Sequence, residues 1–206
     1  MTTELPSTGV PDASRPLRAD ARRNRARILQ AAEGVFAAAG PSASTEEVAR
    51  QAGVAIGTVF RHFPTKGALL EAVVVERLRR LLDEARSLSA TDDPGTGFFA
   101  FLDQWVQEMA TKHAVADALA GAGVDVEAMR SEHAQLVHEL HLAVGALLSR
   151  AQRAGAVRDD VRVPELIAVL VGTSRAAEHA GADAGLKARA LAIVFDGLRP
   201  RPTGSP

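Results

Sequence analysis

Apolar residues recur at intervals of three and four along most of the chain, as they do on the buried face of an α-helix. The first such stripe starts near Asp20 and stops before Gly40 and Pro41, a pair that ends helices. No segment combines sustained apolar–polar alternation with many β-branched residues, which is the pattern of a strand. The sequence therefore predicts an all-α protein.

Polar residues and turn signals indicate where the other helices begin and end. Ser44 and Glu47 form a capping-box pattern, in which the serine accepts from the third helical amide and the glutamate reaches back. Thr65 is placed to cap a long helix that connects the two parts of the chain. After the first helix, the pattern predicts helices over residues 45–53, 56–63, 65–88, 98–113, 115–120, 126–154, 164–179 and 184–198, with a loop over 91–97.

The two short helices are joined by a tight turn that contains Gly53, which describes a helix-turn-helix unit. The second helix of such a unit can enter the major groove of DNA while the first crosses the backbone. In the second helix, Val59 and Phe63 are spaced to face the core together with Ile56. The candidate donors to phosphates and base edges lie on the other face and are Thr58, Arg61 and His62.

Two further residues near this helix favour contact with DNA. Gly57 has no side chain, so its backbone can approach a ligand closely. Lys66 lies in the first turn of the long helix, whose free amides already favour a phosphate. Residues 15–66 hold nine bases and four acids, a net charge of +5, in a chain whose total is −1. An anionic partner is one interpretation of this asymmetry, and a chance excess of solvated charge is the other.

Composition argues against several other classes of protein. The chain has no cysteine, which excludes disulfides, thiolate metal sites and cysteine nucleophiles. The N-terminus lacks the apolar segment of a secretory signal, and the longest aliphatic run is too short to cross a bilayer. No phosphate-binding loop, nucleophile elbow or fixed acid pair is visible, and His138 and His141 lack zinc-protease spacing. We therefore predict a cytoplasmic protein that is not an enzyme and has no catalytic residue, cofactor, metal or membrane partner.

The stretch from Asn24 to Val73 has an apolar first helix, a threonine-led second helix, a glycine-valine turn, and His-Phe followed by a lysine and a leucine pair. In this combination it resembles the DNA-binding domain of the TetR family of transcriptional regulators. The matching residues are Thr45, Gly53, Val54, Gly57, Thr58, His62, Phe63, Lys66 and Leu69. The resemblance implies a homodimeric repressor whose larger C-terminal domain binds a small effector. The predicted DNA-binding residues are then Thr45, Gly57, Thr58, Arg61, His62 and Lys66.

The resemblance also suggests how the chain is divided. We expect a disordered arm over residues 1–18, a helix-turn-helix domain over 19–66, a helical effector-binding and dimerisation domain over 67–199, and a disordered tail over 200–206. The arm and the start of the first helix carry several arginines, which can contact DNA or simply keep the segment soluble.

The chain departs from the family pattern in the second short helix. Phe60 stands where the family usually has a tyrosine, whose hydroxyl would contact a phosphate. Ile56 replaces a residue that is often polar. Base recognition is therefore expected to use Arg61, the amide of Gly57 and apolar contact with thymine methyl groups.

Apolar side chains of the larger domain can line an effector pocket or simply form its core. The pocket candidates are Phe98, Phe101, Leu102, Trp105, Met109 and Met129, and Trp105 is preferred because it combines a large apolar face with one donor. The last two helices can likewise complete the core or form a dimer interface. The interface candidates are Leu166, Leu170, Leu191, Val194 and Phe195, with the small residues Ala168, Gly172, Ala176 and Ala177 allowing close approach between helices.

The sequence as a whole predicts a transcriptional regulator that binds a palindromic double-stranded operator. The resemblance favours a repressor that a small-molecule effector releases, and the apolar C-terminal sequence favours an aromatic or otherwise apolar effector. The alternative is a helical adaptor that uses the helix-turn-helix unit to bind proteins instead of DNA.

Overall fold

The computed structural model describes residues 14–109, 112–179 and 184–200, and every regular element in these ranges is helical. The all-α prediction is confirmed. The chain begins with α1 (Ser14–Ala39) and a short 3-10 helix, η1 (Gly40–Ser42). The other helices are α2 (Thr45–Ala52), α3 (Ile56–His62), α4 (Lys66–Leu88), α5 (Pro94–Met109), α6 (Lys112–Gly121), α7 (Val126–Glu132), α8 (Ala134–Arg153), α9 (Val163–His179) and α10 (Ala184–Leu198).

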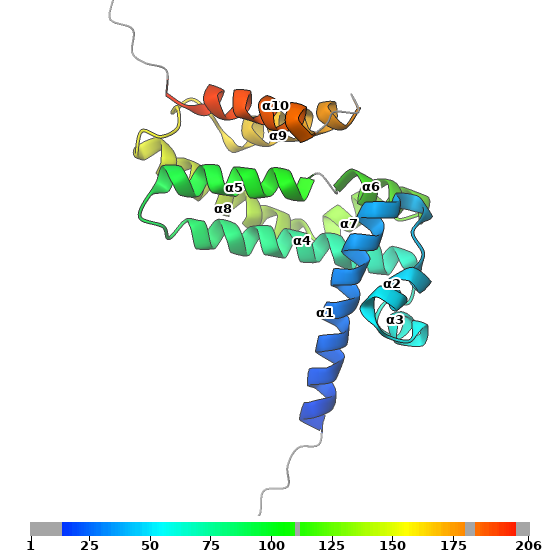
Figure 1. Ribbon diagram of the computed structural model, residues 1–206. Coiled ribbons are helices and arrows are strands. Elements are labelled where there is room, and N and C mark those ends of the chain that lie inside the picture. Colours follow the sequence, from blue (N-terminus) through cyan, green and yellow to red (C-terminus); the bar gives the residue numbers. More distant parts are fainter. Residues whose placement is uncertain (1–13, 110–111, 180–183, 201–206) are drawn as a thin grey trace, which may run out of the picture.

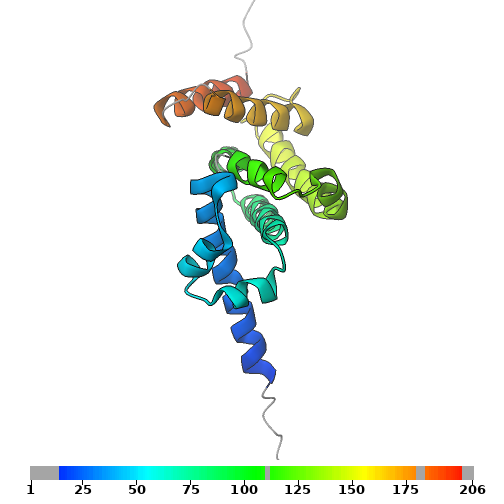
Figure 2. The same cartoon turned by 90° about the vertical axis from the view of Figure 1, so that its right-hand side faces the viewer.

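The helices form two groups that share the long helix α4 (Figure 1). In one group α4 packs against α5 and α8, and the pair α9 and α10 lies along the side of α5. In the other group α1 packs against α4 and α2, and α3 packs against α2. The first turns of α1 extend beyond the rest of the molecule on the side of α2 and α3 (Figure 2).

Two separate clusters of buried apolar side chains hold these groups together. The N-terminal cluster joins α1, α2, α3 and the first turns of α4 with residues of α6, and Ile28, Phe36 and Val59 are fully buried in it. The C-terminal cluster joins the second half of α4 with α5, α8, α9 and α10. Along α4 the change occurs between Val73, in the N-terminal cluster, and Leu81, in the C-terminal cluster.

The helix α1 begins earlier than the sequence pattern predicts. It starts at Ser14 rather than near Asp20, so residues 14–18, assigned to a disordered arm, are helical. Pro16 does not prevent this because it falls in the first turn, where its missing N–H has no intrahelical acceptor to lose. The remainder of the predicted arm, residues 1–13, and residues 201–206 of the predicted tail lie outside the described residues.

Helix boundaries in the larger domain also differ from the prediction: the helix predicted over 98–113 ends at Met109, and the next begins at Lys112 instead of 115. The helix α5 starts at Pro94, inside the predicted loop, because the Asp93 carboxylate accepts from the amides of Gly95 and Thr96, each at 3.0 Å. The helix predicted over 126–154 is divided at His133, whose backbone leaves the helical region. The His133 ring reaches across to Glu71 on α4, with 2.9 Å between Nε2 and Oε1. None of the helices in the described ranges is long and apolar enough to span a membrane.

Candidate DNA interface

The first helix of the helix-turn-helix unit is fixed at its N-terminus by Ser44. The Ser44 hydroxyl accepts a hydrogen bond from the backbone N–H of Glu47 at 3.1 Å, as the capping pattern predicts. The carboxylate of Glu47 was expected to reach back to Ser44, and this part of the prediction is wrong. It accepts instead from Arg50 Nε at 2.8 Å, one turn further along α2.

The turn between α2 and α3 depends on glycine and on an arginine from α1. Gly53 has φ +61°, in the left-handed region that favours glycine. Arg27 Nη2 donates to the carbonyl of Ala52 at 2.5 Å and to that of Gly53 at 3.3 Å. These are terminal carbonyls of α2, which lack intrahelical donors, so Arg27 both satisfies them and ties α2 to α1. Sequence reasoning assigned this arginine to a general basic segment and missed its role.

The buried face of α3 is narrower than the sequence pattern predicts. Val59 and Phe63 are buried, with exposed fractions of 0% and 4%. Ile56 was expected beside them, but it is 37% exposed, so that prediction is wrong. Ile56 is the first residue of α3, and Val54 from the preceding turn packs against the N-terminal cluster in its place.

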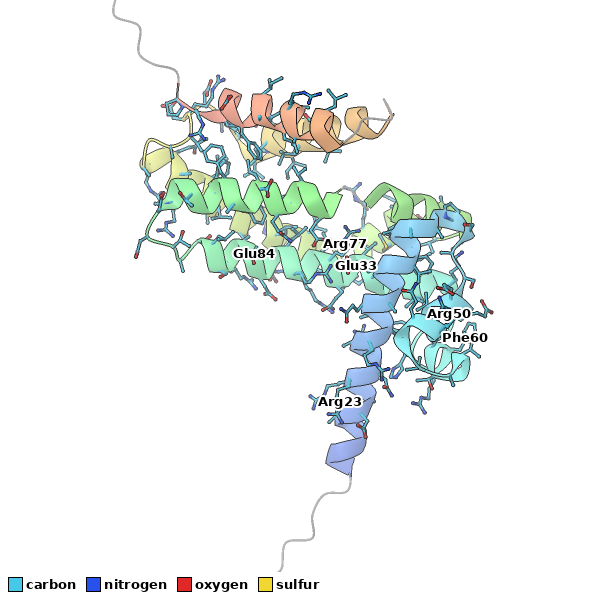
Figure 3. All side chains as sticks on the ribbon, in the orientation of Figure 1. Arg23, Glu33, Arg50, Phe60, Arg77 and Glu84 are labelled. Atoms are coloured by element: carbon cyan, nitrogen blue, oxygen red, sulfur yellow. The ribbon has the colours of Figure 1, made fainter. Side chains whose placement is uncertain are left out.

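The outer face of α3 offers a mixed apolar and basic surface. Ile56, Gly57, Phe60 and Arg61 are exposed on it, and Phe60 is seen at the outer side of the motif in Figure 3. A Cβ at Gly57 would meet no atom within 4 Å, so its backbone lies in open space, accessible to a partner. The outer face therefore presents a guanidinium and an isoleucine, which match the acceptors and methyl groups of base edges, beside the exposed ring of Phe60.

Thr58 and His62 on α3 are half-buried, and Thr45 at the start of α2 is buried with 9% of its surface exposed. The His62 Nε2 atom is buried without a hydrogen-bond partner among the described residues. Burial, and then the positive charges of Arg61 and Arg25, lower the pKa of His62 below its ordinary value of 6.5. In the DNA-free protein His62 is therefore neutral at pH 7.

Lys66, at the start of α4, already has partners in the DNA-free chain. Its ammonium group donates to the carbonyl of Pro41 in η1 at 2.9 Å and lies 5.8 Å from the centre of the Phe36 ring. The half-buried side chain thus connects α4 to the turn after α1. An ammonium has three N–H donors, so two remain for a phosphate.

The aromatic and leucine candidates for an effector pocket lie in closed core. Phe98, Phe101 and Leu102 are fully buried in the C-terminal cluster, and Trp105 is 6% exposed there. The Trp105 Nε1 donor is buried without a partner among the described residues. Met129 packs against the other cluster, far along the chain from these residues, and the Met109 side chain lies outside the described residues.

The candidates for the dimer interface mostly belong to the core of their own chain. Leu166, Leu170 and Leu191 are buried, with at most 8% of their surfaces exposed, and Val194 and Phe195 pack partly against the C-terminal cluster. The large apolar side chains exposed on α9 and α10 are Val169, Leu186 and Ile193. The side chains of Ala176 and Ala177 lie outside the described residues.

One group of side chains in the described part of the chain has the composition of a metal site. Ligand atoms of Glu71, Glu132 and His133 all lie within 4.8 Å of one another. The group sits where α7 and α8 meet α4, and Glu71 and His133 already bond each other there.

Comparison with known proteins agrees with this geometry. Residues 28–73 match the family model of bacterial regulatory proteins of the tetR family. Residues 93–200, more than half of the chain, match the C-terminal domain of SbtR-like transcriptional regulators. The chain belongs to the TetR family of transcriptional regulators. The resemblance inferred from the sequence is thereby confirmed, together with a DNA-binding helix-turn-helix domain.

Solved structures of other TetR-family proteins share the complete fold. A TetR transcription regulatory protein from Mycobacterium vanbaalenii is 42% identical, with 90% of this chain and 100% of that chain covered and a TM-score of 0.72. A TetR transcriptional regulator from Streptomyces coelicolor is 32% identical, with 86% of this chain and 99% of that chain covered and a TM-score of 0.71.

A relative found by sequence agrees with these structures. The HTH-type transcriptional regulator UidR of Escherichia coli (strain K12) is 26% identical over 70% of this chain and 74% of its own length.

Proposed function

We propose that this TetR-family protein is a homodimeric repressor that binds a palindromic operator and leaves it when a small molecule binds the C-terminal cluster. The observation that carries the proposal is the outer face of α3, the second helix of the helix-turn-helix unit, which exposes Ile56, Gly57, Phe60 and Arg61. A face that mixes an arginine with apolar side chains fits base edges in the major groove.

The residues around α3 take different roles in this proposal. Arg61 recognises base edges, and Ile56 meets thymine methyl groups. His62 and Lys66 bind phosphates, which fixes the register of α3 on the duplex without reading sequence. Thr45 contributes at most a weak contact because it is mostly buried.

The second copy of the chain is proposed to bind through the outer sides of α9 and α10. Ile193 on α10 is 74% exposed in the single chain, and Val169 on α9 and Leu186 on α10 are exposed as well. The exposed small residues Ala168 and Gly172 allow α9 of the partner to approach closely. A twofold dimer of this kind presents two copies of α3 to successive major grooves, about 34–36 Å apart, which is why the operator is expected to be palindromic.

The effector is proposed to be an apolar molecule that carries at least one hydrogen-bond acceptor. Trp105 is surrounded by apolar residues of the C-terminal cluster, and its buried Nε1 donor lacks a partner among the described residues. An unpaired buried donor carries a free-energy cost, which an acceptor on the ligand would remove. The core is closed in the DNA-free chain, so binding requires the surrounding helices to separate. The ligand then favours whichever arrangement of helices accommodates it.

The function is tested by selecting binding sites from random duplex DNA with the purified protein at two salt concentrations. We expect an enriched palindrome and binding that weakens steeply with salt, because several phosphates are neutralised. The Arg61→Ala variant is selected in parallel as a control and should lose the base preference at one position of each half-site. Absence of both enrichment and salt-sensitive binding would contradict the proposal and favour a protein-binding adaptor.

A further inference from the structure

A buried charge lies on α4 between the two apolar clusters. Arg77 is 7% exposed. On α4, Val73 before it belongs to the N-terminal cluster and Leu81 after it belongs to the C-terminal cluster. Burying a guanidinium in such a place is costly unless it is fully paired. The groups that pair with Arg77 therefore show which helices this buried charge connects.

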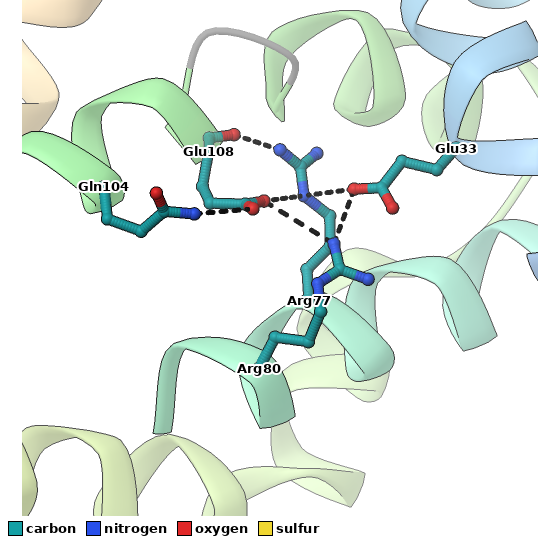
Figure 4. Close-up of polar contacts among 5 residues, drawn as sticks. All are labelled: Glu33, Arg77, Arg80, Gln104 and Glu108. Atoms are coloured by element: carbon teal, nitrogen blue, oxygen red, sulfur yellow. Dashed lines mark hydrogen bonds and ion pairs between the residues drawn. The ribbon is translucent and has the colours of Figure 1, made fainter. Parts of the chain in front are cut away.

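The guanidinium of Arg77 contacts both α1 and α5 (Figure 4). Its Nε atom lies 3.4 Å from Oε1 of Glu33 on α1 and 3.1 Å from Oε2 of Glu108 on α5. Its Nη2 atom also donates to the backbone carbonyl of Glu108. That carbonyl lies in the last turn of α5, where carbonyls have no intrahelical donor, so Arg77 holds the end of α5 itself.

A second arginine completes the group. Arg80, one turn further along α4, places Nη2 at 2.7 Å from Glu33 and 3.7 Å from Glu108. Gln104 on α5 donates to the other carboxylate oxygen of Glu108 at 3.5 Å. Two carboxylates from two different helices are thus shared by two guanidinium groups of a third (Figure 4). We call Glu33, Arg77, Arg80 and Glu108 the junction network.

The junction network differs in kind from the apolar contacts on either side of it. The apolar contacts depend on the area that they remove from water, since the hydrophobic effect has no preferred direction. Charge-assisted hydrogen bonds depend strongly on distance and angle, and Arg77 at the centre of the network is buried. A displacement of α5 that separates Glu108 from Arg77 therefore leaves charges without partners. The pairing is kept only if Arg77 and Arg80 follow Glu108, and Glu33 on α1 then has to follow the two arginines.

We infer that the junction network couples α5 of the effector-binding part to α1 of the DNA-binding part, and so carries the effect of one site to the other. The inference rests on the proposed release of DNA by an effector. Trp105 lies one turn before Glu108 on α5, and Glu33 lies on the helix whose Arg27 holds α2. A shift of α5 around Trp105 thereby reaches the helix-turn-helix unit through three consecutive contacts.

The coupling can be tested without knowing the effector, because coupling between two sites is reciprocal. Trp105 is the only tryptophan in the chain, so tryptophan fluorescence reports on the surroundings of this one residue of α5. The full-length protein is titrated with its selected operator, and Trp105 emission is recorded together with the anisotropy of labelled DNA. In the wild-type protein, operator binding should change the Trp105 emission.

The test variant is Glu33→Ala, which removes the contacts of α1 with Arg77 and Arg80, while Arg77 keeps its bonds to Glu108. The matched control is Glu139→Ala on α8, which removes another interhelical ion pair with α4, that of Arg86 and Glu139 at 2.9 Å. We expect Glu33→Ala to bind operator but to lose the emission change, and Glu139→Ala to retain it. Glu108→Gln weakens the network from the α5 side and should lose the change as well.

The possible results separate the inference from the proposed function. If the wild-type protein does not bind operator, the proposed function fails and the inference fails with it. If the wild-type protein binds operator without a change in Trp105 emission, the inference alone is wrong. It is also wrong if Glu33→Ala retains the full change, or if Glu139→Ala loses it to the same extent.

Discussion

Ile56 and Phe60 lie one turn apart on α3, and both side chains are exposed, by 37% and 43%. Between them the helix carries Gly57, whose backbone is open to approach. A helix at the surface usually turns its large apolar side chains inward. On α3 this rule holds for Val59 but not for the outer pair, so the outer pair is available to DNA.

The exposed position of Phe60, where the family usually has a tyrosine, predicts the effect of adding a hydroxyl to the ring. In Phe60→Tyr the added hydroxyl projects from an exposed site and can donate to a phosphate, which should tighten operator binding by about 1 kcal/mol per half-site. Anisotropy titrations of operator DNA measure this gain directly. Unchanged or weaker binding would show that the position does not face the backbone.

Arg61 and Lys66 should have different effects on specificity. Arg61→Ala should cost about 1–3 kcal/mol on the selected operator and relax the preference at one base position. Lys66→Ala should weaken binding to all sequences alike and make the dependence on salt less steep. The comparison requires both variants to be titrated against operator and unrelated duplexes. Wild-type affinity in both variants would mean that α3 is not placed as proposed.

The sequence was sufficient to predict the local features of the helix-turn-helix unit. Ser44 caps α2 and Gly53 ends it, because both effects depend only on residues within a few positions of the chain. Contacts between distant residues could not be predicted in this way. The bond from Arg27 to Ala52 and the pairing of Arg77 with Glu108 join different helices, and no spacing in the sequence records them.

The same limit explains what periodicity left open and where it placed a helix wrongly. An apolar stripe indicates that one face of a helix is buried, but not whether the same chain or a second copy buries it. The stripe with Leu166 and Leu170 is therefore compatible with an interface as well as with the core, in which both residues are buried. Periodicity also continues through a break in a helix. The helix is divided at His133, whose ring contacts Glu71 on another helix, and no spacing in the sequence records this contact.

Two glycines of the motif should respond in opposite ways to substitution by alanine. Gly53→Ala should destabilise the protein by about 1–2 kcal/mol because φ is +61°, and a Cβ there would lie 2.8 Å from Arg27 Nη2. Gly57→Ala has space for its methyl group and should leave stability unchanged or slightly raised, yet weaken DNA binding by blocking close approach. Urea unfolding and operator titration of both variants measure these effects. Equal losses of stability would contradict the distinction.

The protonation of His62 predicts a dependence on pH. Burial lowers its pKa in the folded protein, so below about pH 6.5 the unfolded chain binds more protons than the folded chain. Above about pH 6.5 His62 is neutral in both states and does not lower the free energy of unfolding. As the pH falls from there towards the pKa of His62 in the folded protein, the free energy of unfolding decreases. Thermal unfolding across this range should show the loss in the wild-type protein and a smaller loss in His62→Asn.

Operator binding should act on His62 in the opposite direction. A phosphate beside the ring favours its charged form and raises the pKa, so binding should take up a proton near neutral pH. Calorimetric titration in buffers with different ionisation enthalpies detects this uptake. The same uptake in His62→Asn would show that another group is responsible.

The proposed dimer surface predicts the effect of a charge at Ile193. In Ile193→Asp a carboxylate would be buried without a partner between two copies of α10, which strongly disfavours association. We expect monomers in analytical ultracentrifugation and a large loss of operator affinity, because the two half-sites are then bound independently. Leu142→Asp is the matched control, since Leu142 is 59% exposed on α8 and should tolerate the charge. A dimer that persists in Ile193→Asp but dissociates in Leu142→Asp would place the interface on α8.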